Sequence, residues 1–475
     1  MLPTQREQMW LLLGVATGVT LALLFRRSST RRTANGTSLL GQDKPLLVTR
    51  RVEACIPLPI KEIAAEVASK IAAGHSIVNM SQGVPCLPIF EKSDKAMTAI
   101  VQSRRLPYSA VPGIESVRKT CAAFVNSMYG LADAFSAENV IVTAGGIQAC
   151  HLAFGLVLEG PDDVVVSTVP AYPLYQLESA YFGATFAPIA LSRDGGAVPS
   201  PEGLEAAFAQ HRAAGRQLRA LVLCAPNNPT GAAMTEEEAR GLATVLEAEM
   251  RREQAAVALG DQRPKGFIVL LDEVYIGIEG SAHVSLLQFA SPALRRRLCL
   301  VLSASKGLGA MPGARAAWVT CADPALVLDM AKIQSCASGN ASTIAQAGLQ
   351  ASLEHCLSSP SVLREVSEYY AVRTRRVADG LNALGRKHKL SQPLCRAPDA
   401  TFYVWADFAQ LRAVPSDKVI FERLLELGVA LIPGSAFSVA PERKLVRLSC
   451  AQDSLAMIDT ALEIIDRAMG EWLRL

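Results

Sequence analysis

Six short apolar runs alternate with longer stretches of helical periodicity through the middle of the chain. The runs cover residues 139–146, 162–170, 218–228, 266–275, 298–305 and 315–321. Because short runs rich in β-branched residues predict buried strands, the pattern indicates strands separated by helices. One predicted helix starts at Thr235, and Glu238 follows at capping-box spacing. The alternation predicts an α/β fold with a mainly parallel central sheet and helices on both faces, whose functional groups lie at the carboxyl ends of the strands.

An unusual polar cluster follows nearly every predicted strand. The clusters read TAGGIQA at 143–149, PAYPLY at 170–175, NNPTG at 227–231, DEVY at 272–275 and SASK at 303–306. Each alone has an ordinary explanation, such as a glycine turn, a core tyrosine or an aspartate that caps a helix. However, a carboxylate that ends an apolar strand is costly unless it meets a positive charge or donors. The small residues that crowd the lysine in SASKGLGA are expected to line a slot for a ligand.

Together the clusters fit a planar ring with a phosphate, a protonated ring nitrogen, a phenolic oxygen and a carbonyl that captures a lysine. Pyridoxal phosphate has these groups, and it stabilises carbanions by drawing electrons into its ring. From about residue 75 to 470, the chain also resembles a class I/II aminotransferase of the fold-type I pyridoxal-phosphate superfamily. The resemblance rests on the clusters above, in the family's order, followed by PGAR at 312–315, PGSAF at 433–437 and VRLS at 446–449. It implies a large cofactor-binding domain and a smaller α+β domain.

The resemblance also implies a role for each residue of the clusters. Lys306 would form the Schiff base and move the proton between Cα and the cofactor. Asp272 would pair with the ring nitrogen and keep it protonated. Asn228 and Tyr275 would hydrogen-bond the phenolic oxygen, and Tyr172 would stack on the ring. The phosphate would be held by Ser303, Ser305, Arg315 and the backbone at Gly145, Gly146 and Ile147.

Three further positions match substrate and subunit contacts of the family. Arg447 in KLVRLSCA matches the arginine that binds the substrate α-carboxylate, and Gly83 in MSQGVP matches a backbone segment that closes over the substrate. Tyr108 matches a tyrosine that reaches the cofactor phosphate of the neighbouring subunit. The resemblance therefore implies a homodimer whose active sites are shared between subunits.

The expected reaction is transamination between an L-amino acid and a 2-oxo acid. Two alternatives stay open, because related enzymes use the same residues for β-elimination or cyclisation, and a non-catalytic cofactor-binding module would keep the fold. The sequence does not name the substrate. A second cation for a dicarboxylate, or an apolar pocket, would come from loops that the pattern does not place.

Composition bounds the remaining possibilities. A chain of 475 residues with 50% hydrophobic residues can bury more than one core. Its formal net charge of +3 gives no support for nucleic-acid binding, and its 11 cysteines include no CxxC pair that would indicate a metal site. The predicted domains comprise an N-terminal anchor and tether at 1–45, a small domain at 46–105 and 336–475, and a large domain at 106–335.

The N-terminal segment is predicted to anchor the protein to a membrane. Met9–Phe25 contains 17 residues without a charge, which as a helix would span roughly 25 Å. Four arginines follow it between residues 26 and 32, so the positive-inside rule keeps the catalytic part in the cytosol. The alternative is a cleaved organellar presequence, because residues 26–42 are basic, rich in Ser and Thr, and contain no acid.

Overall fold

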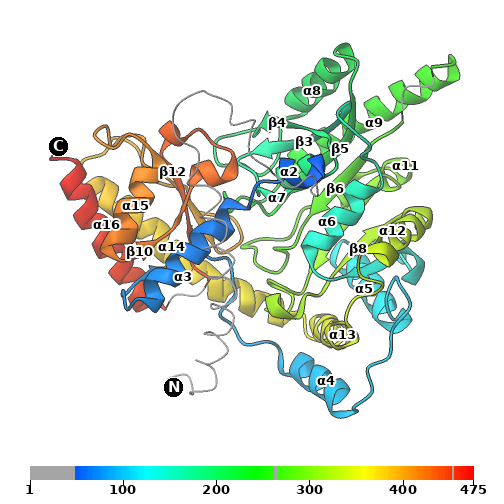
Figure 1. Cartoon of the computed structure of the whole chain (residues 1–475), viewed down its shortest axis with the longest axis horizontal. Helices are drawn as coiled ribbons and strands as arrows, with labels where there is room; N and C mark the ends of the chain where they lie inside the picture. Colours follow the sequence, from blue (N-terminus) through cyan, green and yellow to red (C-terminus); the bar gives the residue numbers. More distant parts are fainter. Residues whose placement is uncertain (1–48, 262–264, 452–453, 475) are drawn as a thin grey trace.

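The computed structural model describes residues 49–261, 265–451 and 454–474. A seven-stranded sheet forms the centre of its larger unit, in the order β2-β8-β7-β6-β5-β3-β4 (Figure 1). Only β8 runs antiparallel to its neighbours, so the predicted α/β fold with a mainly parallel sheet is confirmed. The strands are β2 (Val140–Thr143), β3 (Asp163–Val169), β4 (Thr185–Ala190), β5 (Gln217–Cys224), β6 (Ile268–Asp272), β7 (Leu298–Ser303) and β8 (Ala317–Cys321).

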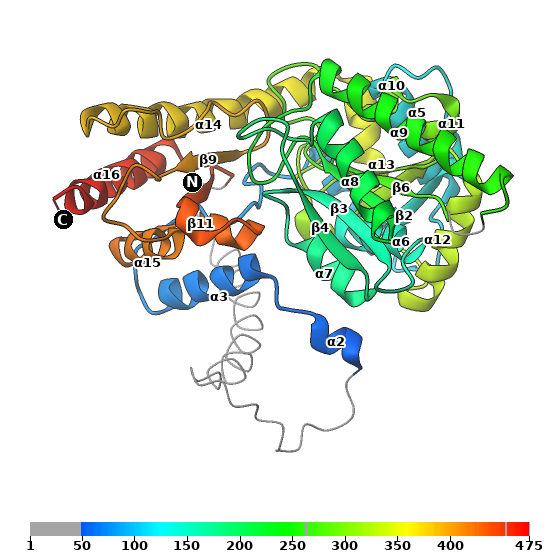
Figure 2. The same ribbon diagram turned by 90° about the horizontal axis from the view of Figure 1, so that it is seen from above.

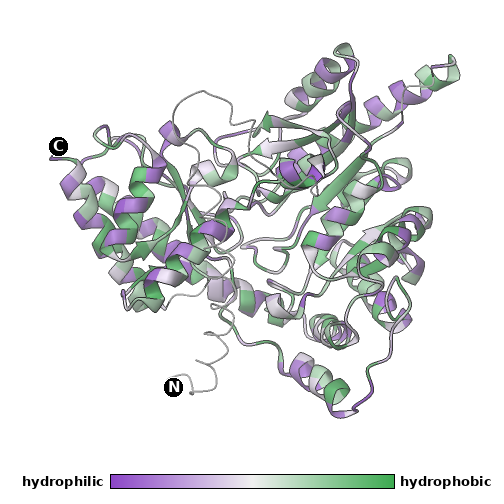
Figure 3. Cartoon of the chain, in the orientation of Figure 1, coloured by the Kyte–Doolittle hydropathy of each residue, from purple (hydrophilic) through white to green (hydrophobic). Residues whose placement is uncertain are grey.

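Helices cover both faces of this sheet (Figure 2). One face packs against α6 (Gly146–Gly155), α7 (Leu174–Tyr181) and α12 (Pro324–Ala337). The other packs against α5 (Glu115–Met128), α8 (Pro201–Ala213), α9 (Glu236–Ala258), α10 (Leu286–Phe289), α11 (Pro292–Arg295) and α13 (Thr343–Ser358). Because both faces are covered, the central strands are apolar at almost every position and appear green in Figure 3.

The predicted capping box at the start of α9 is present. The hydroxyl of Thr235 accepts from the backbone N–H of Glu238 at 3.2 Å, and the carboxylate of Glu238 accepts from the N–H of Thr235 at 2.9 Å. The two bonds satisfy backbone donors that a helix start leaves free.

A smaller unit with its own apolar core lies beside the sheet. It contains a parallel pair, β1 (Val78–Asn79) with β10 (Val429–Ala430). It also contains an antiparallel sheet of β11 (Ile432–Pro433), β12 (Leu445–Ser449) and β9 (Tyr403–Asp407). The helices of this unit are α3 (Pro59–Ala72), α14 (Ser361–Lys387), α15 (Asp417–Leu427) and α16 (Leu455–Trp472).

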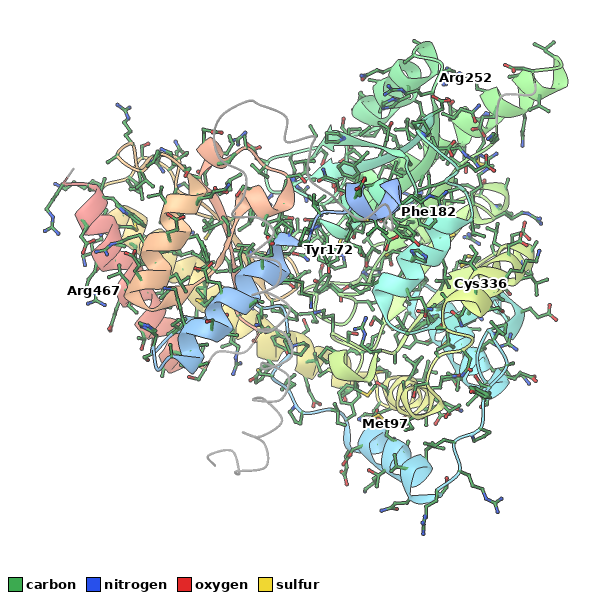
Figure 4. The ribbon with its side chains drawn as sticks, in the orientation of Figure 1. Met97, Tyr172, Phe182, Arg252, Cys336 and Arg467 are labelled. Atoms are coloured by element: carbon green, nitrogen blue, oxygen red, sulfur yellow. The ribbon has the colours of Figure 1, made fainter. Side chains whose placement is uncertain are left out.

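Packing divides the chain differently from the predicted domain boundaries. α13 lies beyond residue 335, yet its Leu349 and Leu353 are buried in the core of the large unit. Met97 of α4 (Glu91–Gln102) also packs against that core (Figure 4). A helical pattern shows which face of a helix is apolar, but it does not show which core that face joins. The domain boundaries therefore stay a prediction.

The N-terminal part is described only from residue 49, where α2 (Arg50–Ala54) begins next to α7. The predicted anchor Met9–Phe25 and its basic tether lie outside the described residues. Within the described ranges, no helix combines the length and the apolar character that a membrane span needs.

Candidate active site

Residues from separate motifs meet where the carboxyl edge of the large sheet faces the smaller unit. Asp272 is the last residue of β6, and Lys306 follows the end of β7 by three residues. The amine of Lys306 donates to the backbone carbonyl of Gly83, and Arg447 of the smaller unit donates to Asn228 at 2.9 Å. Tyr172, which follows β3, lies near the centre of the molecule in Figure 4.

Lys306 is a half-buried amine that forms no ion pair with a described acidic residue. Burial lowers the pKa of its amine to about 7, repulsion from neighbouring cations adds to this shift, and attraction to Asp272 opposes it. The cations are, in decreasing order of effect, Arg447, Lys61 and Arg315. A pKa near 7 leaves a large share of the amine neutral and nucleophilic at physiological pH.

The glycines that follow Lys306 face protein, which corrects the interpretation that these small residues line a ligand slot. A Cβ added at Gly307 would lie 2.4 Å from the carbonyl oxygen of Ile276, and one at Gly309 would lie 2.8 Å from Ser352 Oγ. The glycines therefore let the turn pack against the loop after β6 and against α13. Glycine in a sequence indicates that space is limited, but not what limits it.

Asp272 has one carboxylate oxygen that is bonded and one that is not. Its Oδ2 accepts from the hydroxyl of Tyr175 at 2.6 Å, and its Oδ1 is buried without a hydrogen-bond partner among the described residues. Burial raises the pKa of this carboxyl, while Tyr175 and the N–H of Val274 counteract the shift. A protonated ring nitrogen would supply the missing donor, so this position fits pyridoxal phosphate. Tyr172 lies beside this pair, with its ring 6.0 Å from that of Tyr175.

The expected phosphate contacts gather around the start of α6. Gly145, at the N-cap, has φ +88°, and a Cβ there would lie 2.2 Å from a guanidinium nitrogen of Arg315. Arg315 is exposed, donates only to backbone carbonyls, and forms no ion pair with a described acid. The hydroxyls of Ser303 and Ser305 are 2.8 Å apart, and Ser303 also donates to the carbonyl of Ala316, the residue that follows Arg315. A helix start, two hydroxyls and an arginine without a counterion are donors that suit a phosphate.

Gly146 and Ile147 form the first turn of α6, as the resemblance implied, and the Ile147 side chain is exposed. Tyr108 is not brought into the site of its own chain. Its side chain is 95% exposed and has no hydrogen bond to another site residue in the described part of the protein.

Arg447 is a fully buried guanidinium without a carboxylate partner among the described residues. Its two terminal nitrogens donate to Asn228 Oδ1 at 2.9 Å and to the carbonyl of Ser81 at 2.6 Å, and its Nε has no partner in this part of the chain. The guanidinium lies 4.2 Å from the ring centroid of Tyr403 and 5.1 Å from that of Phe437. A charge buried in this way is costly alone and strongly favours an incoming anion.

Two tyrosines belong to this site although sequence reasoning missed them. Tyr175 lies in the first turn of α7 and Tyr172 lies two residues before that helix, so their spacing of three residues was a usable signal. Tyr403, whose hydroxyl lies 3.0 Å from that of Tyr275, gave no signal in the sequence. A Cβ at Gly83 would lie 1.9 Å from the Tyr403 hydroxyl, so this position has to be glycine.

A network of buried charged side chains begins at the residue that follows Asp272. The next residue, Glu273, is 1% exposed and accepts from Ser285 Oγ at 2.5 Å and from His283 at 2.6 Å. The other ring nitrogen of His283 lies 2.9 Å from Glu279. Burial opposes the charged imidazole, but the two carboxylates outweigh it and raise the pKa of His283 to about 10. This network fixes the loop that packs against Gly307.

Comparison with known proteins gives a consistent family. The profile described as "Aminotransferase class I and II" matches residues 75–252 and 254–465. The aspartate/prephenate aminotransferase of Thermus thermophilus is 28% identical over 425 residues, which cover 89% of this chain and 99% of that protein. The valine–pyruvate aminotransferase of Mycobacterium tuberculosis is 26% identical and covers 88% of this chain and 96% of its own length.

Solved structures give the same picture. The aspartate aminotransferase of Thermus thermophilus with maleate has a TM-score of 0.74 at 26% identity, with 88% of this chain and 99% of that chain covered. The aspartate aminotransferase of Rhizobium meliloti has a TM-score of 0.75 at 26% identity and covers 90% and 99%.

Proposed function

Because the chain belongs to the family of class I and II aminotransferases, we propose that its transamination between an L-amino acid and a 2-oxo acid takes place around Lys306. The protein is a pyridoxal-phosphate-dependent aminotransferase. The observation that carries the assignment of the site is the buried Oδ1 of Asp272, which has no hydrogen-bond donor among the described residues and lies at the sheet edge where Lys306 also lies. When bound, pyridoxal phosphate supplies an electron sink for the substrate Cα.

Lys306 is the residue that we assign to cofactor attachment and proton transfer. Its amine has a pKa lowered to about 7 by burial and nearby cations, so it can accept a proton at neutral pH. In this role its Nζ would take the proton from the substrate Cα and deliver it to the cofactor, and it would carry the proton in the opposite direction when the 2-oxo acid is converted. The carbonyl of Gly83, to which Nζ donates, holds the amine in place.

Asp272 and Tyr175 are assigned to the ring nitrogen of the cofactor. The hydroxyl of Tyr175 donates to one oxygen of the Asp272 carboxylate and so fixes its orientation. The other oxygen would then accept from the ring N–H of the cofactor. The side-chain carbonyl oxygen of Asn228 accepts from Arg447, so its amide N–H groups are assigned, with Tyr275, to donate to the phenolic oxygen. Tyr172 is assigned to stack on the ring.

Arg447 is assigned to the substrate α-carboxylate. Its hydrogen bonds to Asn228 and Ser81 orient the guanidinium before substrate arrives, which reduces the ordering cost of binding. Arg315, the two serines of SASK and the backbone at Gly145 are assigned to the phosphate.

A homodimer with shared sites accounts for Tyr108. This side chain is almost fully exposed. Two apolar side chains shortly before it in the chain, Val101 and Leu106, are 54% and 59% exposed. Isolated chains seldom expose apolar side chains along one segment without a partner surface. We assign Tyr108 to the cofactor phosphate of the partner subunit.

The location of the enzyme is proposed from the sequence alone. Met9–Phe25 is assigned to a membrane anchor with the catalytic part on the cytosolic side. The alternative is an organellar presequence that is removed.

One experiment separates transamination from elimination or cyclisation. With an amino acid alone, a transaminase converts one substrate per site and stops, and added 2-oxo acid restores turnover. An eliminating enzyme instead turns over repeatedly on the amino acid alone and releases ammonia. Three of the four similar proteins and structures reported above are named for aspartate, so aspartate is the first amino donor to test. Repeated turnover on the amino acid alone, with ammonia release for elimination or without it for cyclisation, would overturn the assignment.

A further inference from the structure

The segment that follows Tyr108 is fixed to the large unit by two buried glutamine side chains. It leads into α5 in the lower right of Figure 1. Gln334 of α12 and Gln346 of α13 are both 0% exposed. The amide group of Gln334 donates to the carbonyl of Val111 at 2.7 Å and to that of Val142 in β2 at 3.1 Å. This glutamine therefore joins the segment to the edge strand of the central sheet.

Gln346 holds two further points of the same segment. Its Oε1 accepts from the backbone N–H of Ile114 at 2.7 Å. Its Nε2 donates to the hydroxyl of Ser109 at 3.1 Å and to the carbonyl of Ala341 at 2.8 Å, so both N–H groups of the amide are used. Ser109 is the residue next to Tyr108. The hydrogen bonds of Gln346 thus reach to within one residue of the exposed tyrosine.

The segment also packs directly on β2. Gly113 has φ +108°, and a Cβ there would lie 2.8 Å from Val142 Cγ2 and 3.0 Å from Gln346 Oε1. The carbonyl of Pro112 accepts from the backbone N–H of Val142 at 2.8 Å. Because a side chain at position 113 would not fit, glycine allows the close approach that the glutamine contacts need.

The side chain of Tyr108 has none of this support. It is 95% exposed and has no hydrogen bond or ring contact in the part of the chain that the structure describes. The backbone beside it is fixed, whereas its phenol ring meets only solvent in its own chain. A group carried on a fixed backbone loses less freedom when it binds a partner, so this arrangement favours a contact outside the chain.

We propose that Gln346 is a positioning residue for the active site of the partner subunit. Through Ser109 and Ile114 it holds the backbone from which Tyr108 reaches the cofactor phosphate of that subunit. The inference rests on the proposed function, which assigns Tyr108 to this phosphate. Loss of the Gln346 side chain should therefore weaken cofactor binding in the other subunit's site and leave the site of its own subunit unchanged.

The test uses mixed dimers in which one subunit carries Lys306→Ala. Borohydride can then attach the cofactor covalently only in the site that keeps Lys306, so the label remaining after dialysis measures cofactor retention in that site alone. Gln346→Ala in the Lys306→Ala subunit should make cofactor loss about 3-fold to 10-fold faster, the effect expected for one hydrogen bond. The same change in the subunit that keeps Lys306 should have no effect.

Two further variants separate positioning from folding. Ser109→Ala removes only the hydroxyl to which Gln346 donates, and it should act in the same direction and from the same subunit, also if Gln346→Ala does not fold. Gln350→Ala is the matched control. It removes a glutamine one turn along α13 that bonds to Ser116 and Glu354 and not to the Tyr108 segment, so it should leave retention unchanged.

Tyr108→Phe in the Lys306→Ala subunit is the reference for the outcomes. If Tyr108→Phe speeds cofactor loss but Gln346→Ala and Ser109→Ala do not, the role of Gln346 is overturned while shared sites stand. Equal effects of Gln346→Ala from either subunit would also overturn it and make Gln346 a structural residue. No effect of Tyr108→Phe would overturn the proposed shared site itself.

Discussion

Replacing Arg447 with alanine should weaken the capture of amino acids far more than the capture of simple amines. The guanidinium is fully buried, and its two donating nitrogens are already oriented by Asn228 and Ser81. Removing one partner of a buried, hydrogen-bonded charge pair costs about 2–5 kcal/mol. Since 1.4 kcal/mol corresponds to a factor of ten, kcat/KM for an amino acid should decrease by a factor between roughly 30 and several thousand.

The assay follows the cofactor absorbance after rapid mixing with an amino acid or with a primary amine that lacks a carboxylate. Arg447→Ala should keep the cofactor spectrum of the resting enzyme and lose rate only with the amino acid. Arg447→Lys should lie between wild type and alanine, because it keeps the charge but loses the planar, two-donor geometry. Equal losses for the amino acid and the amine would refute the reasoning and make Arg447 a structural residue.

Three further predictions concern stability, assembly and location. Because the pKa of His283 is raised from 6.5 to about 10, its pairs with Glu273 and Glu279 stabilise the fold fully below pH 6.5 and lose this effect as pH rises through 10. His283→Gln should therefore lower the free energy of unfolding, measured in urea at pH 6, by about 3 kcal/mol or more, and by less at pH 10. A decrease that does not depend on pH would contradict a charged imidazole. Tyr108→Phe should weaken cofactor retention. A mixed dimer of one Tyr108→Phe subunit and one Lys306→Ala subunit should recover part of the activity only if sites are shared, because one of its two sites then combines an intact Lys306 with an intact Tyr108. The full-length protein should sediment with membranes and resist carbonate extraction, and removing residues 1–40 should release an active, soluble dimer. A native protein that is already soluble and shortened at its N-terminus would favour the presequence.

The ends of the predicted strands located most of the site. A buried parallel strand has to place its last residue at the carboxyl edge, so the apolar runs placed Asp272 and the lysine that follows β7 at that edge, and the resemblance gave their roles. The site residues of the smaller unit could not be placed in this way. Arg447 lies in the middle of an ordinary strand, β12, and only the order of motifs singled it out. Its neighbour Tyr403 carries no motif, because its place depends on how two distant segments pack.

Tertiary contacts also decide the features that the sequence did not predict. The glycines around Lys306 were interpreted as ligand space, but Gly307 meets the backbone of Ile276, which lies 31 residues earlier in the chain. The place of α13 in the core of the large unit likewise depends on how helices pack. Periodicity gives the apolar face of a helix and the end of a strand, but not the partner that either one meets.

The attachment of the cofactor to Lys306 is the central claim, and one measurement tests it most directly. Borohydride reduction of the native enzyme followed by peptide mapping should place the cofactor on Lys306. In the Lys306→Ala variant, Asp272, Arg315 and the Gly145 turn remain, so the cofactor should still bind without a covalent bond. Turnover should then fall by at least about 10²–10⁴-fold, the loss expected for a positioned acid–base group. A label on another lysine, or normal turnover by Lys306→Ala, would contradict the account.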